Sequence, residues 1–139
     1  MNNNLCTILI ADNDFISAKN LEKELLKEGF RVFMADSSRE IFSQIRKHKI
    51  DFAIIDVDLK DIEGYKIVPL IKDISKNIKV IITTSRSSAE LEGKCRETGI
   101  IYYGIKPLNY KQILEIIRFS KKSRGGFIHP NSMCNIKGG

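Results

Sequence analysis

Five short apolar segments alternate along the chain with longer segments of helical spacing. The apolar segments predict strands at Cys6–Ala11, Arg31–Ala35, Phe52–Asp56, Lys79–Thr83 and Ile101–Gly104. The first, third and fourth are almost continuously aliphatic or aromatic, which is typical of strands buried on both faces of a parallel sheet. Between Phe15 and Glu28 the spacing is helical, with the apolar positions at Ile16, Leu21, Leu25 and Leu26.

Helix boundaries are marked by capping patterns and glycines. The patterns that resemble capping boxes are Ser37-x-x-Glu40, Ser87-x-x-Glu90 and, in a looser form, Asn109-x-x-Gln112. Gly29 and Gly99 fall just after the first and fourth helical segments, where a left-handed C-cap is needed. Pro69 lies inside the third helix, expected at about Tyr65–Lys72, and predicts a kink or an early turn there.

Strict alternation of strand and helix predicts a single doubly wound α/β domain with a parallel five-stranded sheet. Right-handed crossovers and a flavodoxin-like order of 2-1-3-4-5 place the first and third strands side by side. We expect this domain to span residues 5–123. Residues 124–139 are then a basic, flexible tail or the start of a linker.

The composition points to the cytoplasm. Hydrophobic residues make up 42% of the chain, and no apolar run approaches the roughly 20 residues that cross a bilayer. The polar start Met1–Asn4 leads directly into a strand and does not have the form of a signal peptide. Cys6, Cys95 and Cys134 have no metal-ligand spacing, so we expect reduced thiols.

The net charge of +6 raises the question of nucleic-acid binding. No acidic residue occurs after Glu115, and the cations that follow are Arg118, Lys121, Lys122, Arg124 and Lys137. A helix C-terminus favours cations, and no zinc pattern, stacking aromatic residues or additional recognition helix accompanies them. We therefore expect no direct nucleic-acid binding by this domain.

Polar side chains follow four of the five predicted strands, at the carboxyl ends where open α/β sheets bind ligands. These residues are Asp12 and Asn13 after the first strand, Asp56 and Asp58 at the third, Thr84 at the fourth and Lys106 at the fifth. Each one alone is explained as an ordinary loop residue or helix cap, and Asp14 needs no other explanation than capping. Their joint placement predicts one site.

The chemistry that these residue types suit is phosphoryl transfer onto a carboxylate. An aspartate can act as a nucleophile that forms an acyl phosphate, and the transfer depends on neutralising charge on the phosphoryl oxygens. Mg²⁺ binds one or two carboxylates together with waters and phosphate oxygens. Lys106 supplies a mobile positive charge, and Thr84 supplies a hydroxyl donor.

Four segments together resemble the receiver domains of bacterial response regulators. They are Thr7–Ile16 (TILIADNDFI), Asp51–Gly64 (DFAIIDVDLKDIEG), Val80–Ser85 (VIITTS) and Gly99–Leu108 (GIIYYGIKPL). All four occur in the family's order, and the resemblance extends from about Leu5 to Ser123.

The resemblance implies that Asp56 is the phosphorylation site and that Lys106 and Thr84 contact the phosphoryl group. Tyr103 has the position of the family's aromatic switch residue, which turns inward when the threonine is drawn to the phosphate. The resemblance also implies a cis peptide bond before Pro107, since the reversal that returns Lys106 to the strand ends is tight and only X–Pro bonds adopt cis at low cost.

The implied Mg²⁺ site consists of Asp12, Asn13, Asp56 and the backbone carbonyl of Asp58. Asn13 stands where the family has a second acidic residue, so one negative charge is missing and we expect weak binding of Mg²⁺. Lys60 replaces a frequent proline and is expected to bring a cation close to the site.

The implied function is a phosphorylation-dependent signalling switch, not an enzyme acting on a separate substrate. A sensor histidine kinase or a histidine phosphotransfer protein would donate to Asp56, and an unknown downstream protein would read the altered surface. Ile101–Tyr102 replaces an acidic pair that is common in regulators dimerising through this face, so dimerisation stays open.

Two alternatives remain at this point. The first is a degenerate receiver that binds partners without phosphorylation; Asn13 and Lys60 favour it, whereas the intact Asp56, Thr84 and Lys106 oppose it. The second is a flavin or nucleotide enzyme of the same topology. Against it, the loop after the first strand is acidic and no glycine-rich phosphate-binding loop is present.

Overall fold

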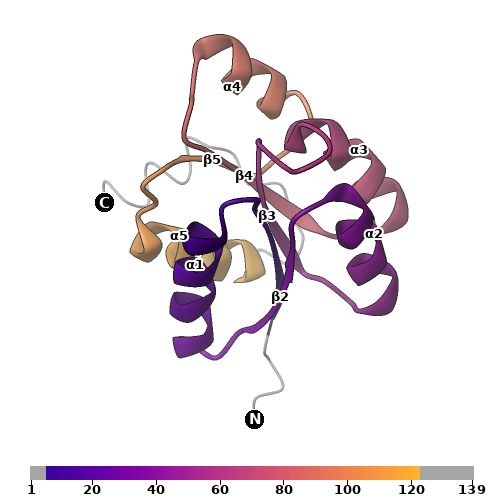
Figure 1. The fold of residues 1–139 in the computed structure, drawn as a ribbon. Helices are drawn as coiled ribbons and strands as arrows, with labels where there is room; N and C mark the ends of the chain where they lie inside the picture. The colour runs from indigo at the N-terminus through magenta and orange to yellow at the C-terminus, as the bar shows by residue number, and fades with distance from the viewer. Residues whose placement is uncertain (1–5, 123–139) are drawn as a thin grey trace.

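The computed structural model describes residues 6–122, in which five strands and five helices alternate (Figure 1). The strands are β1 (Thr7–Ala11), β2 (Arg31–Ala35), β3 (Phe52–Asp56), β4 (Lys79–Thr84) and β5 (Tyr102–Ile105). The helices are α1 (Phe15–Lys27), α2 (Ser38–Lys47), α3 (Gly64–Ile74), α4 (Ala89–Arg96) and α5 (Tyr110–Lys122). The predicted α/β class is confirmed, and each strand boundary lies within one residue of its expected position.

All strand pairs are parallel, and the order is β2-β1-β3-β4-β5, as predicted. In the pairing of β1 with β3, Ala11 is the partner of Ile55. In the pairing of β3 with β4, Asp56 is the partner of Thr83. The chain order reverses between β1 and β3, so the carboxyl ends of these two strands form the switch point where such sheets bind ligands.

Two apolar layers cover the faces of the sheet. On one face, Ile8 and Ile10 of β1 pack with residues of α1 and α5 such as Leu25 and Ile113. On the other, the alternate residue Leu9 packs with residues of α2, α3 and α4. Figure 1 shows α1 and α5 together on one side of the sheet, with α2 and α3 on the other. The central strands are therefore buried on both faces.

Helix α1 buries a narrower stripe than its apolar positions suggest. Leu21 and Leu25 are buried with Ala18, as expected from their spacing. Ile16 and Leu26, which are also apolar, are 71% and 52% exposed. Both lie off the stripe of residues three and four apart that contacts the sheet, so these two apolar positions do not belong to the buried face of α1.

Two of the three predicted N-caps are observed. Ser37 Oγ accepts the Glu40 N–H at 3.3 Å, and Asn109 Oδ1 accepts the Gln112 N–H at 3.1 Å. The third prediction is wrong by one residue, because Ser88, not Ser87, caps α4 by accepting the N–H of Leu91.

The glycine and proline positions agree with the sequence analysis. Gly29 and Gly99 have φ angles of 90° and 85° at the C-terminal ends of α1 and α4, a region that side chains with a Cβ rarely adopt. Pro69 lies inside α3.

The remaining composition-based expectations concern cysteines and membranes. Residues 124–139, including Cys134, lie outside the described residues. Cys6 and Cys95 are free and buried, and burial raises the pKa of both thiols. From Cys6 to Lys122, no helix is both long and apolar enough to span a bilayer.

Candidate functional site

The carboxyl edge of the sheet brings together residues that are far apart in the sequence. Asp56 is the last residue of β3, Thr84 the last of β4, and Lys106 follows β5. Asp12 follows β1, and its backbone N–H donates to the Ala35 carbonyl at the end of β2. Because parallel strands end at one edge, these side chains meet at the predicted switch point.

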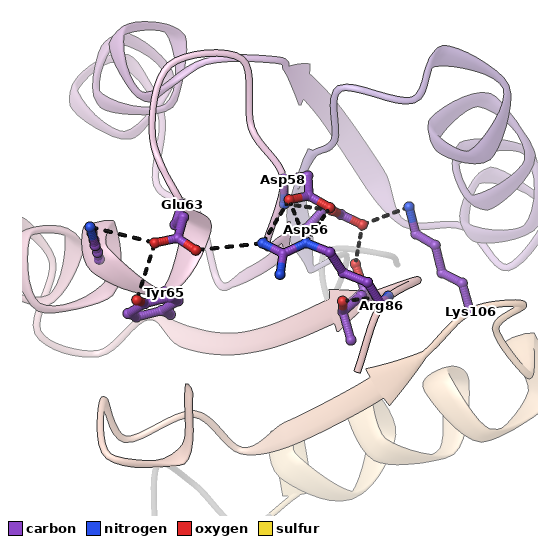
Figure 2. Close-up of polar contacts among 9 residues, drawn as sticks. Asp56, Asp58, Glu63, Tyr65, Arg86 and Lys106 are labelled. Atoms are coloured by element: carbon purple, nitrogen blue, oxygen red, sulfur yellow. Dashed lines mark hydrogen bonds and ion pairs between the residues drawn. The ribbon is translucent and has the colours of Figure 1, made fainter. Parts of the chain in front are cut away.

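Asp56 is a buried carboxylate with donors on both oxygens (Figure 2). Only 4% of the residue is exposed. Its Oδ1 accepts the Asp58 N–H at 2.7 Å, and its Oδ2 lies 2.6 Å from Lys106 Nζ and 3.3 Å from Thr83 Oγ1. Burial of an anion is tolerated when charge and hydrogen bonds compensate it. The carboxylate is therefore held in one orientation at the end of the central strand.

Lys106 joins two carboxylates. Its Nζ lies 2.8 Å from Asp12 Oδ2 and 2.6 Å from Asp56 Oδ2, and only 14% of its side chain is exposed. Burial alone would lower the pKa of Lys106, but the hydrogen bonds and charges of the two carboxylates outweigh it and raise that pKa. Burial raises the pKa of Asp12, against the opposing hydrogen bond from Lys106.

The connection after β5 has the expected backbone form. The Lys106–Pro107 peptide bond is cis, the isomer that the sequence analysis expects. The Lys106 N–H donates to the Thr84 carbonyl at 2.8 Å and extends the pairing of β4 with β5.

Two adjacent threonines end β4, and they have different contacts. Thr84, predicted to contact phosphate, is fully buried, and its Oγ1 accepts the Arg86 N–H at 3.0 Å. Thr83, which the sequence reasoning did not select, donates its hydroxyl to Asp56. The pairing register makes Thr83 the direct partner of Asp56, so a sheet register drawn from the sequence would have identified it.

Only two of the predicted metal ligands have side chains that are shown to converge. Asp12 and Asp56 converge on one nitrogen of Lys106, whereas Asn13 is exposed at a bend. Among residues 6–122, no group of three or more His, Cys, Asp or Glu side chains is suited to a metal ion. Two converging carboxylates nevertheless fit Mg²⁺, which takes one or two protein carboxylates and keeps several waters.

Asp58, expected to contribute its carbonyl, also has a paired side chain. Arg86 Nη2 lies 2.9 Å from Asp58 Oδ1, and Arg86 Nε donates to both Asp58 oxygens at 3.0 and 3.2 Å (Figure 2). Arg86 Nη2 also lies 3.5 Å from Glu63 Oε2. Asp58 raises the pKa of Arg86. The sequence analysis missed Arg86, whose only signal is a cation two residues after a strand-end threonine.

Lys60, expected to bring a cation close to the site, is paired with the β2–α2 connection. Its Nζ lies 3.1 Å from Asp36 Oδ2, and its backbone N–H donates to the Asp36 carbonyl. Both side chains are exposed. The described ionic partner of Lys60 is therefore Asp36, and its effect on the site stays a prediction.

Tyr103 is inward in this structure. The residue is 6% exposed, and its hydroxyl lies 2.8 Å from Ser87 Oγ. The Arg96 guanidinium lies 5.8 Å from the centre of its ring. Ser87, expected to cap α4, instead connects the loop after β4 to β5.

Comparisons with known proteins agree with this geometry. The family model for the response regulator receiver domain matches residues 8–118. The transcriptional regulatory protein ZraR of Escherichia coli K12 is 31% identical over 106 residues, 76% of this chain and 24% of ZraR. Sporulation initiation phosphotransferase F of Bacillus subtilis is 25% identical over 111 residues, 80% of this chain and 90% of that protein.

A solved structure supports the same relationship. The CheY-like receiver domain protein of Methanospirillum hungatei JF-1 has a TM-score of 0.81 and 27% identity, covering 88% of this chain and 99% of that one. The chain spans about a quarter of the length of ZraR, since only 24% of that relative is matched.

Proposed function

The chain belongs to the response regulator receiver family, and on that premise we propose that Asp56 is its phosphoacceptor. Receiver domains are signalling domains of two-component systems, in which phosphorylation on aspartate and binding of Mg²⁺ are typical. The observation that supports Asp56 is its position at the end of β3, buried and hydrogen-bonded on both oxygens. Phosphorylation would then switch the surface of the domain.

The proposed step is an in-line phosphoryl transfer. An Asp56 oxygen forms a bond to phosphorus while the bond from phosphorus to the donor's histidine nitrogen breaks, and that nitrogen takes up a proton from solvent. Such a transfer needs positioning and charge neutralisation more than covalent help. Lys106, already 2.6 Å from Asp56, is placed to neutralise a phosphoryl oxygen, and the Thr84 hydroxyl is the proposed hydrogen-bond donor.

Asp12, Asp56, the Asn13 amide and the Asp58 carbonyl are the proposed Mg²⁺ ligands. The ion would neutralise charge on the phosphoryl oxygens. Weak binding is expected, because Asn13 lacks the charge of a carboxylate and is exposed in the structure.

The proposed donors are a sensor histidine kinase or a histidine phosphotransfer protein in the cytoplasm, and a downstream protein would recognise the phosphorylated form. Any phosphoryl transfer is onto the domain itself, and direct nucleic-acid binding is not part of its role. Thr84 and Tyr103 are the proposed switch residues. The alternative, a degenerate receiver that binds partners without phosphorylation, is supported by the amide at Asn13.

Incubation of the full chain with Mg²⁺ and a small acyl-phosphate donor, followed by intact-mass measurement, separates the two functions. We expect one phosphoryl adduct that is labile in alkali, is absent in Asp56→Asn and is unchanged in Asp61→Asn, an exposed carboxylate of the next loop. An adduct that persists in Asp56→Asn would move the acceptor elsewhere. No adduct in the wild type would favour the degenerate receiver.

A further inference from the structure

Arg86 connects the two loops that border Asp56 (Figure 2). It lies between β4 and α4, and its guanidinium pairs with Asp58 and Glu63 of the connection between β3 and α3. All three side chains are about half exposed: Arg86 at 50%, Asp58 at 48% and Glu63 at 41%. Two half-exposed carboxylates therefore stand beside the site, and one arginine holds both.

The guanidinium of Arg86 has donors to spare. Its five N–H groups form a planar fork suited to carboxylate or phosphate. Nε and Nη2 contact Asp58 and Glu63, whereas no hydrogen bond or ion pair joins Nη1 to any of residues 6–122. Lys106, by comparison, is 14% exposed and already joins two carboxylates. Arg86 is thus the more accessible of the two cations.

Arg86 also contacts Asp58, whose backbone donates to the reacting carboxylate, and Thr84, the proposed hydrogen-bond donor to the phosphoryl group. Its side chain holds Asp58, whose N–H donates to Asp56 Oδ1 at 2.7 Å. Its own N–H donates to Thr84 Oγ1 at 3.0 Å. That bond uses the oxygen of the Thr84 hydroxyl as an acceptor, so the hydroxyl hydrogen is left to donate elsewhere.

We propose that Arg86 is a phosphate-binding residue at this site, one that receives the phosphoryl group through Nη1 while Asp58 and Glu63 hold the side chain extended. The physical reason is charge: an incoming phosphoryl dianion meets the Asp58 and Glu63 carboxylates, and Arg86 both neutralises them and offers free donors. Charge-assisted hydrogen bonds of arginine to phosphate are among the stronger ones in proteins. The inference rests on the proposed phosphorylation of Asp56.

Phosphorylation kinetics of the full chain test this role. With Mg²⁺ present, the rate of adduct formation is measured against the concentration of a small acyl-phosphate donor. We expect Arg86→Ala to lower kcat/KM about three- to tenfold, chiefly through a higher KM for the donor. Arg86→Lys should recover part of the loss, because lysine keeps the charge but not the fork.

Arg118→Ala is the matched control. The Arg118 side chain is 52% exposed and pairs with a carboxylate, that of Glu28 at the C-cap of α1. Its loss should leave the donor KM unchanged. An equal loss in Arg118→Ala and Arg86→Ala would reduce the effect to net charge and overturn the proposal.

A double variant separates direct binding from neutralisation of Asp58. If Arg86 contacts the phosphoryl group, Arg86→Ala with Asp58→Asn should remain impaired, and Asp58→Asn alone should bind the donor at least as well as the wild type. Recovery of the wild-type KM in the double variant would mean that Arg86 only cancels the Asp58 charge, which overturns the proposal.

The proposed function fails independently of this inference. Absence of a wild-type adduct, or an adduct that survives in Asp56→Asn, would refute phosphorylation at Asp56 whatever the Arg86 variants do. A wild-type adduct at Asp56 with equal KM in the wild type and Arg86→Ala would refute only the role of Arg86.

Discussion

A single ammonium group between two buried carboxylates leaves an excess of one negative charge. Lys106 contacts Asp12 and Asp56, and the two carboxylates are 8% and 5% exposed as side chains. Burial raises the pKa of Asp12, while the two anions raise the pKa of Lys106. The raised pKa of Lys106 follows from the two anions, so the cluster holds the proton on Lys106 tightly, and its excess negative charge leaves room for a further cation.

The raised pKa of Lys106 has a predictable effect on stability at alkaline pH. The charged form is favoured by folding, so its contribution is fully present below the unfolded value of 10.5 and is lost as pH rises through the folded pKa. We expect the free energy of unfolding to fall more steeply above pH 10.5 in the wild type than in Lys106→Met. Urea unfolding at a series of pH values measures this, and parallel curves would refute it.

Asn13→Asp should tighten Mg²⁺ binding severalfold. At about 4 Å and an effective dielectric near 20, one unit charge contributes on the order of 4 kcal/mol. Much of this is cancelled by desolvation, because Mg²⁺ gives up its waters reluctantly. A Mg²⁺ titration followed by NMR shifts measures the affinity of both proteins.

Asp14→Ala is the control for that titration, since Asp14 caps α1 through the N–H of Ser17. Equal affinity of the wild type and Asn13→Asp would mean that position 13 does not face the metal. Loss of binding in Asp14→Ala, without an effect of Asn13→Ala, would move the acidic ligand to position 14.

At the scale of elements, the entry into α3 is packed against the end of β3. The Gly64 N–H donates to the Val57 carbonyl at 2.7 Å, and a Cβ at Gly64 would lie 2.2 Å from the Asp56 carbonyl oxygen. Backbone cannot yield as a flexible side chain does, so any larger residue displaces the strand end that carries Asp56. A glycine is required here by close approach, independently of its φ angle.

Gly64→Ala is therefore expected to lower the free energy of unfolding by about 2 kcal/mol or more, a large single-residue effect. Gly93→Ala is the control, because a Cβ at Gly93 of α4 meets nothing within 4 Å. That change should stabilise the protein by up to about 1 kcal/mol through helix propensity. Urea unfolding of both variants measures the contrast, and similar effects in the two would contradict the packing argument.

The elements were predictable where local signals are strong. Short apolar segments located all five strands, and Ser37, Asn109, Gly29 and Gly99 marked helix ends as found. The α4 start was misplaced because two adjacent serines carry the same local signal. Only the tertiary contact of Ser87 with Tyr103 decides which of them is left to cap the helix.

The site shows the same division between local and tertiary information. Asp56 and Lys106 were found because the strand ends of a doubly wound sheet converge. Thr83 was missed because its role depends on the register of β4 against β3. Arg86 was missed, and so was the partner of Lys60, because the pairing of an exposed charge depends on loop geometry that no sequence period encodes.

At the scale of the whole molecule, the elements described up to Lys122 form a five-stranded sheet with helices on both faces. All five strands are paired, and α5 contributes Ile113, Ile116 and Ile117 to the core shared with α1. The reversal of strand order places Asp56 between these two layers. The position of the site is thus a property of the topology, and the loops around it set its charge.

Because the described strands and helices all lie between Thr7 and Lys122, we predict that a chain ending at Ser123 folds and is phosphorylated like the full chain. Removing residues 124–139 deletes Arg124 and Lys137 but no acidic residue, starting from a net charge of +6. None of the strands and helices observed between Thr7 and Lys122 is cut. We expect the urea midpoint and the rate of adduct formation to match those of the full chain. A lower midpoint would mean that the domain extends past residue 123, while an unchanged midpoint with a slower reaction would mean that the basic segment assists the anionic donor.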